Sequence, residues 1–350
     1  MARWTTPFLL IVALVAPRAA PAKDLREQSV RDWDARSLTR IEVGNARGET
    51  SVSASRDGRV HLVALKIVRD GDRRGGDQLA RDTRVEAEVA GGALKLYVRY
   101  PQHREIHLDL WDVMKGIEIP EVEVRLSISV PPELSLRLQS ASGDLQTSGI
   151  GGRQDLQASS GDVEVTGATG ALAVATHSGD ATLTDVNGVR LETSSGAVVI
   201  SSARGPVTVH TGSGDVRVDS ASDSLSVETS SGEVRIGLAR SGLNVRTGSG
   251  DVIARAGGRV RVRTESGEAK VALIAPLHAA DLATGSGDLS VRVAQDIEGR
   301  LDADAGSGDV DVQLPMLERT SRNNHIVGRM GRGNTDIVIR SSSGSVNVAR

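Results

Sequence analysis

The chain of 350 residues contains no cysteine, and this absence is the first constraint on its structure. A fold without disulfides is held by burial and hydrogen bonding, and it also lacks the acylated cysteine of a bacterial lipoprotein. Aromatic residues are nearly absent too: three tryptophans, two tyrosines and one phenylalanine occur, none after residue 111. Any core beyond that point must consist of small aliphatic side chains and threonine.

Long apolar runs are also missing, since no stretch approaches the ~20 apolar residues of a transmembrane helix. A shorter run, Phe8–Ala16, follows the basic Arg3 and precedes the small residues Ala20–Ala22. This pattern predicts a secretory signal peptide over residues 1–22. We therefore expect an exported protein, periplasmic, secreted or on the cell surface. Loss of the two arginines in this segment lowers the formal net charge from −3 to −5, which argues against a nucleic-acid partner.

What the sequence has in abundance is a repeat. A Ser-Gly pair, usually followed by Asp or Glu, recurs at steps of 17 to 21 residues, with one final step of 36. The predicted corner glycines are Gly143, Gly161, Gly179, Gly196, Gly214, Gly232, Gly250, Gly267, Gly287, Gly308 and Gly344. The last step is about two units long and predicts a degenerate copy between them, through His325 to Gly333. A fixed period of this kind indicates a repeat architecture.

Apolar residues stand five positions before the glycine and two and four positions after it, and threonine usually stands three before. Alternation on both sides predicts two short strands per unit, each with one buried face. The glycine between them would supply a corner with φ > 0. Stacked about 4.8 Å apart, such units bury a continuous core. We therefore predict an all-β fold, a parallel β-solenoid with ~18-residue coils over residues 136–350.

A second geometry fits the same pattern. If Ser-Gly forms a two-residue hairpin loop, Thr211 pairs with Val216 and Val209 with Val218 in an antiparallel meander. The solenoid is favoured because the apolar and threonine columns stay aligned although the spacing between successive copies varies, as stacking requires.

Residues 23–135 are less regular and form a β-rich segment that caps or starts the solenoid. Charged, glycine-rich Arg69–Gly76 predicts a solvated loop, and no amphipathic helix longer than two turns is expected. Alternation predicts strands within Ser37–Ser53, Val60–Val68, Val85–Val89, Leu94–Tyr100 and Glu121–Val130.

Several segments carry a family resemblance: I-E-V-G-N-A-R-G-E-T-S-V near the start, the serial S-G-D-V-x-V copies, and G-R-G-N-T-D-I-V-I-R-S-S-S-G-S-V-N-V at the end. Over residues 38–350 the chain resembles the bacterial putative-adhesin family of unknown function, an adhesin-like β-strand repeat domain. The resemblance implies a secreted or envelope-associated β-solenoid without assigned catalytic residues. Gly48-Glu49-Thr50 departs from the Gly-Asp-Val more usual in that family, which concerns the first turn alone.

The acidic residue after most corner glycines has two interpretations. Stacked carboxylates could bind calcium, although the G-G-x-G-x-D-x-U-x nonapeptide is not met; alternatively, Asp is a turn former that bonds to nearby backbone. The turn former is favoured. The residues concerned are Asp144, Asp162, Asp180, Asp215, Glu233, Asp251, Glu268, Asp288 and Asp309.

We predict no catalytic residue, cofactor or metal site. A glycosidase needs one local carboxylate pair, whereas these carboxylates recur. His103 and His107 are spaced four apart, but on a predicted strand or loop, which does not suit a metal site. The one candidate recognition surface is the aromatic group Tyr97, Tyr100 and Trp111, which could instead pack the cap.

The leading functional hypothesis is a non-catalytic exported repeat protein, an adhesin-like binding or cell-envelope scaffold module. Its partner would be an envelope component, glycan or protein. Two alternatives stay open: a polysaccharide-active enzyme on a β-helix scaffold, and a calcium-stabilised structural rod.

Overall fold

The computed structural model describes residues 24–69, 73–101 and 121–350. The chain divides into two compact units, Met1–Gly161 and Asp162–Arg350. Trp111, His103 and His107 lie outside the described residues.

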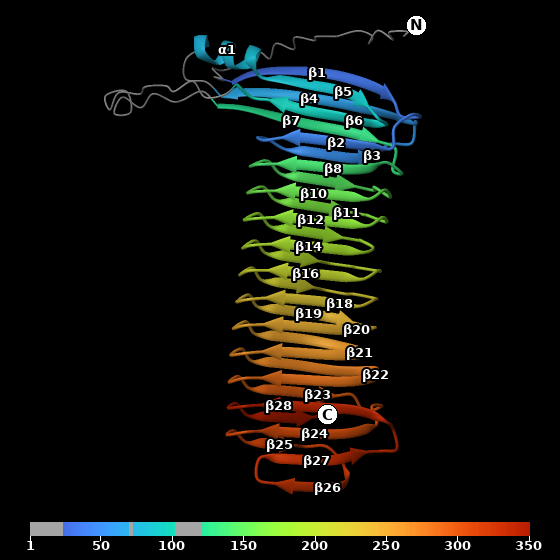
Figure 1. Ribbon diagram of the computed structural model, residues 1–350, viewed down its shortest axis with the longest axis vertical. Coiled ribbons are helices and arrows are strands. Elements are labelled where there is room, and N and C mark those ends of the chain that lie inside the picture. The colour runs from blue at the N-terminus through green and yellow to red at the C-terminus, as the bar shows by residue number, and fades with distance from the viewer. Residues whose placement is uncertain (1–23, 70–72, 102–120) are drawn as a thin grey trace, which may run out of the picture. The chain divides into compact units, whose positions relative to one another are not determined.

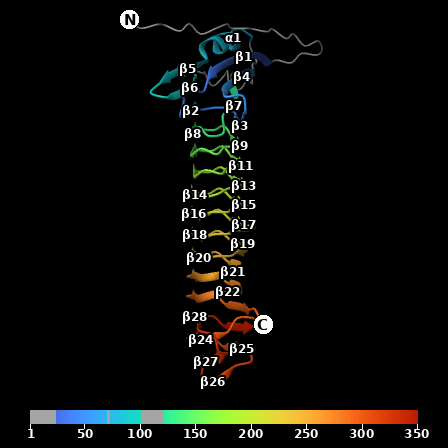
Figure 2. The same ribbon diagram turned by 90° about the vertical axis from the view of Figure 1, so that its right-hand side faces the viewer.

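In the second unit each repeat forms one rung of two short strands, one on either side of the corner glycine (Figures 1 and 2). Strands before the glycine form what we call the leading wall: β12 (Leu172–Thr176), β14 (Val189–Thr193), β16 (Val207–Thr211), β18 (Leu225–Thr229) and β20 (Gly242–Thr247). Strands after it form the trailing wall: β11 (Val163–Thr166), β13 (Ala181–Thr184), β15 (Val198–Ile200), β17 (Val216–Val218) and β19 (Val234–Ala239). The longer strands β21 (Val252–Thr264) and β22 (Ala269–Thr284) run from the trailing wall of one rung to the leading wall of the next.

Each strand pairs in parallel with its counterpart one rung away. Val209 of β16 lies between Leu191 of β14 and Val227 of β18. On the trailing wall β17 pairs with β15 and β19 in the same manner. The parallel β-solenoid is therefore confirmed. The hairpin alternative is wrong, because β16 and β17 pair with neighbouring rungs and not with each other.

The predicted apolar columns form the core of the second unit. Val209, Val227 and Val245 of the leading wall are fully buried, as are Val216 and Val234 of the trailing wall. Each fully buried side chain of this size contributes about 1.5–3 kcal/mol relative to exposure. Because the rungs stack directly on one another, a larger side chain in one rung would displace its neighbours above and below.

The corner glycines are required by a close backbone approach, not by φ. None of the eleven predicted corner positions has a positive φ, so that part of the prediction was wrong. Instead, a Cβ built on Gly214 would lie 1.9 Å from the carbonyl oxygen of Gly196, and one on Gly232 would lie 2.0 Å from that of Gly214. No side chain fits where each rung's corner rests on the corner of the previous rung.

The threonine column closes the same corner from inside. Thr211 is only 7% exposed, and its Oγ1 accepts a hydrogen bond of 3.1 Å from the backbone N–H of Gly214. Thr229 accepts one of 3.2 Å from Gly232, and Thr247 one of 2.9 Å from Gly250. A buried backbone donor left unsatisfied costs about 1–3 kcal/mol. The threonine hydroxyl removes that cost at these three turns.

The C-terminal rung does not follow its predecessor in space (Figure 1). Its strands β28 (Thr335–Ser341) and β29 (Val346–Ala349) insert between the rung of β22 and β23 (Leu289–Val293) and the rung of β24 (Gly299–Ala305) and β25 (Val310–Val312). Gly344 accordingly rests on Gly287, and Gly308 rests on Gly344.

The predicted degenerate copy through His325 to Gly333 is therefore wrong. That segment holds β27 (His325–Met330), which runs antiparallel to β24 and forms a hairpin with β26 (Leu317–Arg322). The step of 36 residues is long because the chain first forms the hairpin of β26 and β27. Then β28 and β29 pair with β22 and β23, beside Gly287.

The first unit starts with a rung from far upstream. β2 (Arg40–Asn45) pairs in parallel with β8 (Ser135–Ser140), and β3 (Thr50–Ala54) with β9 (Leu145–Ser148). β10 (Gln154–Ala158) continues the wall of β8. Gly143 rests on Gly48 just as later corners rest on one another, although Gly48 itself has φ +96°. The segment around Gly48-Glu49-Thr50 is thus the first corner.

Longer strands lie over this rung. On one wall β7 (Glu121–Val130) pairs with β3, then β4 (Arg59–Arg69) and β1 (Asp24–Asp34) follow antiparallel; on the other, β6 (Ala93–Arg99) pairs with β2, and β5 (Arg84–Ala90) follows. The predicted strands are confirmed here, and β1 was not foreseen. The helix α1 (Arg73–Asp82) begins within the segment predicted as a loop, and with 10 residues it is longer than the two turns that were expected as a maximum, so both predictions were wrong there.

We predict that Gly214→Ala destabilises the protein by about 3 kcal/mol or more, because its Cβ would overlap backbone atoms that cannot move without shifting a rung. The matched control is Gly188→Ala, where the nearest atom to a new Cβ is 3.8 Å away. That variant should change stability by less than about 1 kcal/mol. Urea unfolding followed by circular dichroism measures both, and equal losses would contradict the close-approach account.

Candidate functional site

The recurrent carboxylates at the corners are bonded to the backbone of the next rung. Oδ1 of Asp180 accepts a hydrogen bond of 2.8 Å from the N–H of Ala197, and Oδ1 of Asp215 one of 2.8 Å from Glu233. Oδ1 of Asp251 accepts from Glu268 at 2.9 Å. Oδ1 of Asp288 accepts a hydrogen bond of 2.8 Å from the N–H of Ser345, which belongs to the inserted C-terminal rung. These carboxylates therefore act as inter-rung hydrogen-bond acceptors.

The glutamates at the same position pair with cations instead. Glu233 contacts Arg235 at 2.8 Å, and Glu268 contacts Lys270 at 2.8 Å. Within residues 24–69, 73–101 and 121–350, no group of three or more His, Asp or Glu side chains is arranged to hold a metal ion. The four aspartates bond to backbone, as the turn-former interpretation expects, but to the backbone of a neighbouring rung and not to that of their own turn.

The structure separates the described tyrosines of the predicted recognition surface. Tyr97 is 41% exposed, and its ring lies against Gly44 of β2, where a Cβ would be 2.8 Å from its Cδ1. Tyr100 is partly buried, and its hydroxyl can donate its one proton either to Oδ1 of Asn45, 2.7 Å away, or to the carbonyl of Arg47, which is also within hydrogen-bond distance. Burial raises the pKa of the Tyr100 hydroxyl above its ordinary range. Tyr100 thus fastens the first corner, while Tyr97 remains on the surface.

A histidine that the sequence did not single out lies between two carboxylates. Nδ1 of His61 is 2.7 Å from Oδ1 of Asp32, and its Nε2 is 2.5 Å from Oδ2 of Asp57. Hydrogen bonds with Asp57 and then Asp32 raise the pKa of His61. Hydrogen bonds from Ser55 and His61 lower the pKa of Asp57 to about 2. This network ties β1 to β4 at the surface.

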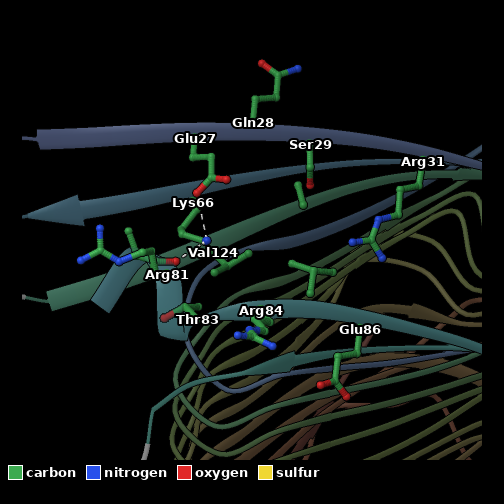
Figure 3. Close-up of a pocket in the computed structure, with 13 residues that line it drawn as sticks. Glu27, Gln28, Ser29, Arg31, Lys66, Arg81, Thr83, Arg84, Glu86 and Val124 are labelled. Atoms are coloured by element: carbon green, nitrogen blue, oxygen red, sulfur yellow. Dashed lines mark hydrogen bonds and ion pairs between the residues drawn. The ribbon is translucent and has the colours of Figure 1, made fainter. Parts of the chain in front are cut away.

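The first unit contains a cleft with a volume of about 640 Å³. It opens where β1 and β4 face β5 and the end of α1 (Figure 3). Apolar atoms of Ala64, Ala80, Val85 and Val124 form part of its lining. The same inward positions that hold valine and leucine in the rungs hold Glu27, Ser29 and Arg31 on β1 and Lys66 on β4. The inward side chains of β1, and that of Lys66 on β4, are therefore polar or charged at the cleft.

One pair of charges organises the cleft. Nζ of Lys66 lies 3.0 Å from Oε2 of Glu27 and donates a 2.5 Å hydrogen bond to the carbonyl of Ala80 near the end of α1 (Figure 3). The Lys66 side chain is only 14% exposed. A lysine at the carbonyl end of a helix bonds to an otherwise unpaired acceptor. Lys66 therefore joins β1, β4 and α1 at the cleft wall.

Sequence reasoning missed the cleft. Its residues come from β1, β4, α1, β5 and β7, none of which carries a motif, and β1 and β7 are distant in sequence from the other three. The one usable signal was Lys66, a charged residue at an inward position of β4, whose other inward positions are apolar.

Two stacked walls of short parallel strands, joined at glycine corners and capped by longer strands, define the chain as a β-solenoid repeat protein. Residues 117–256 and 171–349 match the model of the Toastrack DUF4097 family, a domain of unknown function. The chain belongs to the Toastrack DUF4097 family. The resemblance seen in the sequence is thereby confirmed.

Solved structures of low sequence identity are similar over most of the chain. One from Parabacteroides distasonis, described as a putative lipid binding protein, is 14% identical, with 91% of this chain and 96% of that chain covered and a TM-score of 0.36. A putative cell adhesion protein from Clostridium sporogenes is 10% identical, with 93% and 99% covered and a TM-score of 0.21. A putative adhesin from Bacteroides fragilis is 11% identical, with 92% and 96% covered and a TM-score of 0.25. No curated protein matches significantly.

The part of the chain that the structure describes holds no helix with the length and apolar character needed to cross a bilayer.

If the corner carboxylates serve only as backbone acceptors, Asp215→Ala should destabilise the protein by about 1 kcal/mol, because the N–H of Glu233 loses its partner. Asp215→Asn keeps an oxygen at that place and should be nearly neutral. Thermal unfolding of both variants, with chelator and with millimolar Ca²⁺, checks this. A calcium-stabilised rod would instead show equal losses for both variants and a lower Tm in chelator.

Proposed function

We propose that the protein is a non-catalytic, exported repeat protein that serves as an adhesin-like binding or cell-envelope scaffold module. The observation that carries this proposal is the use of the periodic carboxylates: they hold successive rungs together through backbone N–H groups. Their recurrence is thereby explained by structure. The outward side chains of the walls and the cleft of the first unit are left as the surfaces with which a partner can interact.

The leading wall presents an outward row of matched positions. Glu192, His210, Glu228 and Arg246 occupy the same register position on β14, β16, β18 and β20. Neighbouring parallel strands lie about 4.8 Å apart, so the row repeats at that spacing. His210 and Glu228 contact each other at 3.3 Å along it. A regular, charged row of this type suits an extended partner such as an envelope glycan or a protein segment.

The polysaccharide-active alternative requires a pair of carboxylates that serves one place on the substrate. The corner carboxylates are instead repeated, and those of Asp180, Asp215, Asp251 and Asp288 each bond to the backbone of a neighbouring rung. The proposed function therefore predicts binding without turnover.

The test is retention of envelope material by the chain from residue 23 onward. The protein is immobilised and exposed to solubilised cell-envelope glycans and proteins, and the eluates are analysed by mass spectrometry. We expect saturable retention of an envelope component with its mass unchanged. The control is the Gly214→Ala variant, whose rung stacking is disturbed while the surface charge is the same.

Two results would overturn the proposal. One is the absence of saturable retention of any envelope glycan or protein. The other is shortening of a glycan that a single Asp→Asn substitution abolishes, which would establish the enzyme alternative.

A further inference from the structure

The cleft of the first unit carries an excess of positive charge. Four cations and two carboxylates line it, which gives a formal charge of +2: Arg31, Lys66, Arg81, Arg84, Glu27 and Glu86. Both carboxylates already have cationic partners. Glu27 contacts Lys66 at 3.0 Å, and Glu86 contacts Arg99 at 2.7 Å. The acids therefore do not neutralise the arginines of the cleft.

All three arginines that line the cleft are without an ion-pair partner within residues 24–69, 73–101 and 121–350: Arg31, Arg81 and Arg84. They come from three elements, β1, the last turn of α1 and β5. In Figure 3 Arg31 reaches from β1 into the open space on whose other side Arg84 lies on β5. Figure 3 shows the guanidinium group of Arg81 directed away from that space. The two unpaired guanidinium groups of Arg31 and Arg84, which line one cleft from separate strands, favour an anionic ligand.

A buried hydroxyl lies in the same lining. Thr83 is 1% exposed, and its Oγ1 has no hydrogen-bond partner among the described residues. Thr83 stands between Arg81 and Arg84 in the sequence, at the junction of α1 and β5. An unsatisfied buried hydroxyl costs about 1–3 kcal/mol and calls for a partner. An acceptor oxygen of a ligand would provide one.

We propose that this cleft binds the phosphate group of a small phosphoester, a ligand class that deepens the binding function proposed above and rests on it. A phosphate group has a charge of about −1.5 to −2 at neutral pH, which matches the excess of +2. Arg forks bond to its oxygens in pairs, and several arginines can share one phosphate. A carboxylate has one charge and two oxygens, which is too few acceptors for several arginines to bond to it in pairs.

The size of the cleft favours an organic phosphoester over the bare ion. Its volume of about 640 Å³ falls within the ~300–1,000 Å³ of small-molecule sites. Ala64, Val85 and Val124 offer an apolar surface to the carbon skeleton of the ligand. The cleft therefore recognises a phosphate and part of the molecule that bears it.

Calorimetric titration of the chain from residue 23 onward with glycerol phosphate and with inorganic phosphate tests the proposal. We expect saturable binding of glycerol phosphate, tighter than that of inorganic phosphate. Arg31→Gln combined with Arg84→Gln should raise Kd at least tenfold. The matched control, Arg217→Gln with Arg235→Gln on the trailing wall, removes the same charge from the second unit and should leave Kd unchanged.

Thr83→Val provides a second variant that keeps the volume of the side chain. It should weaken glycerol phosphate binding several-fold while Tm stays equal or rises, because an unsatisfied hydroxyl is removed. A merely structural threonine would not affect Kd. The proposal is overturned if neither probe binds saturably, or if the cleft pair and the control pair change Kd equally.

Vesicles separate the two sources of such a phosphate. Retention on phosphatidylglycerol vesicles, absent on phosphatidylcholine vesicles and competed by glycerol phosphate, assigns the site to a lipid headgroup. Binding of free glycerol phosphate without vesicle retention assigns it to a soluble phosphoester.

The envelope retention assay separates this inference from the proposed function. If the Arg31→Gln and Arg84→Gln variant still retains an envelope component but neither protein binds a phosphate probe, the binding function stands and the cleft assignment fails. If the unsubstituted chain retains neither envelope component nor phosphate probe, both fail.

Discussion

The structure depends on one close approach: the corner of each rung rests, backbone on backbone, on the corner of its neighbour. At Gly214 and its equivalents the space between a potential Cβ and the next carbonyl is about 2 Å, so only glycine fits. Thr211 then satisfies the corner N–H from inside, and Asp215 reaches the backbone of the next rung from outside. The Thr-Gly-Ser-Gly-Asp motif is thus one hydrogen-bonded unit, present in full at residues 211–215, 247–251 and 284–288.

Rungs that stack in this way leave unsatisfied ends, and the chain closes each end by leaving strict sequence order. At the C-terminal end β28 and β29 enter between two earlier rungs, and the hairpin of β26 and β27 covers β24 with an antiparallel strand. In the first unit the longer strands β1, β4 and β7 do the equivalent on one wall. Aliphatic side chains such as Leu62 and Leu126 stay buried there, and a charged cleft lies beside the inward side of β1.

The repeat could be predicted from the sequence because the physics is local and periodic. Valine and threonine columns fixed the strands and their buried faces, and alternation revealed most strands of the cap. What could not be predicted depends on contacts distant in sequence. Nothing near Ser345 indicates that its N–H bonds to Asp288, and nothing near Arg31 indicates that it shares a cleft with Arg84. The corner glycines were predicted at the right positions but for the wrong reason, because a close backbone approach and a positive φ both favour glycine.

Cross-linking tests the stacking of rungs most directly, since the chain has no cysteine of its own. Ser290 on β23 pairs with Asn347 on β29, and Asn347 pairs in turn with Asp311 on β25. Parallel neighbours lie about 4.8 Å apart, within the Cα range of a disulfide, whereas positions two rungs apart lie beyond it. Under mild oxidation, Ser290→Cys with Asn347→Cys should form a disulfide, and Ser290→Cys with Asp311→Cys should not. The opposite result would show that the rungs follow sequence order and would contradict the account.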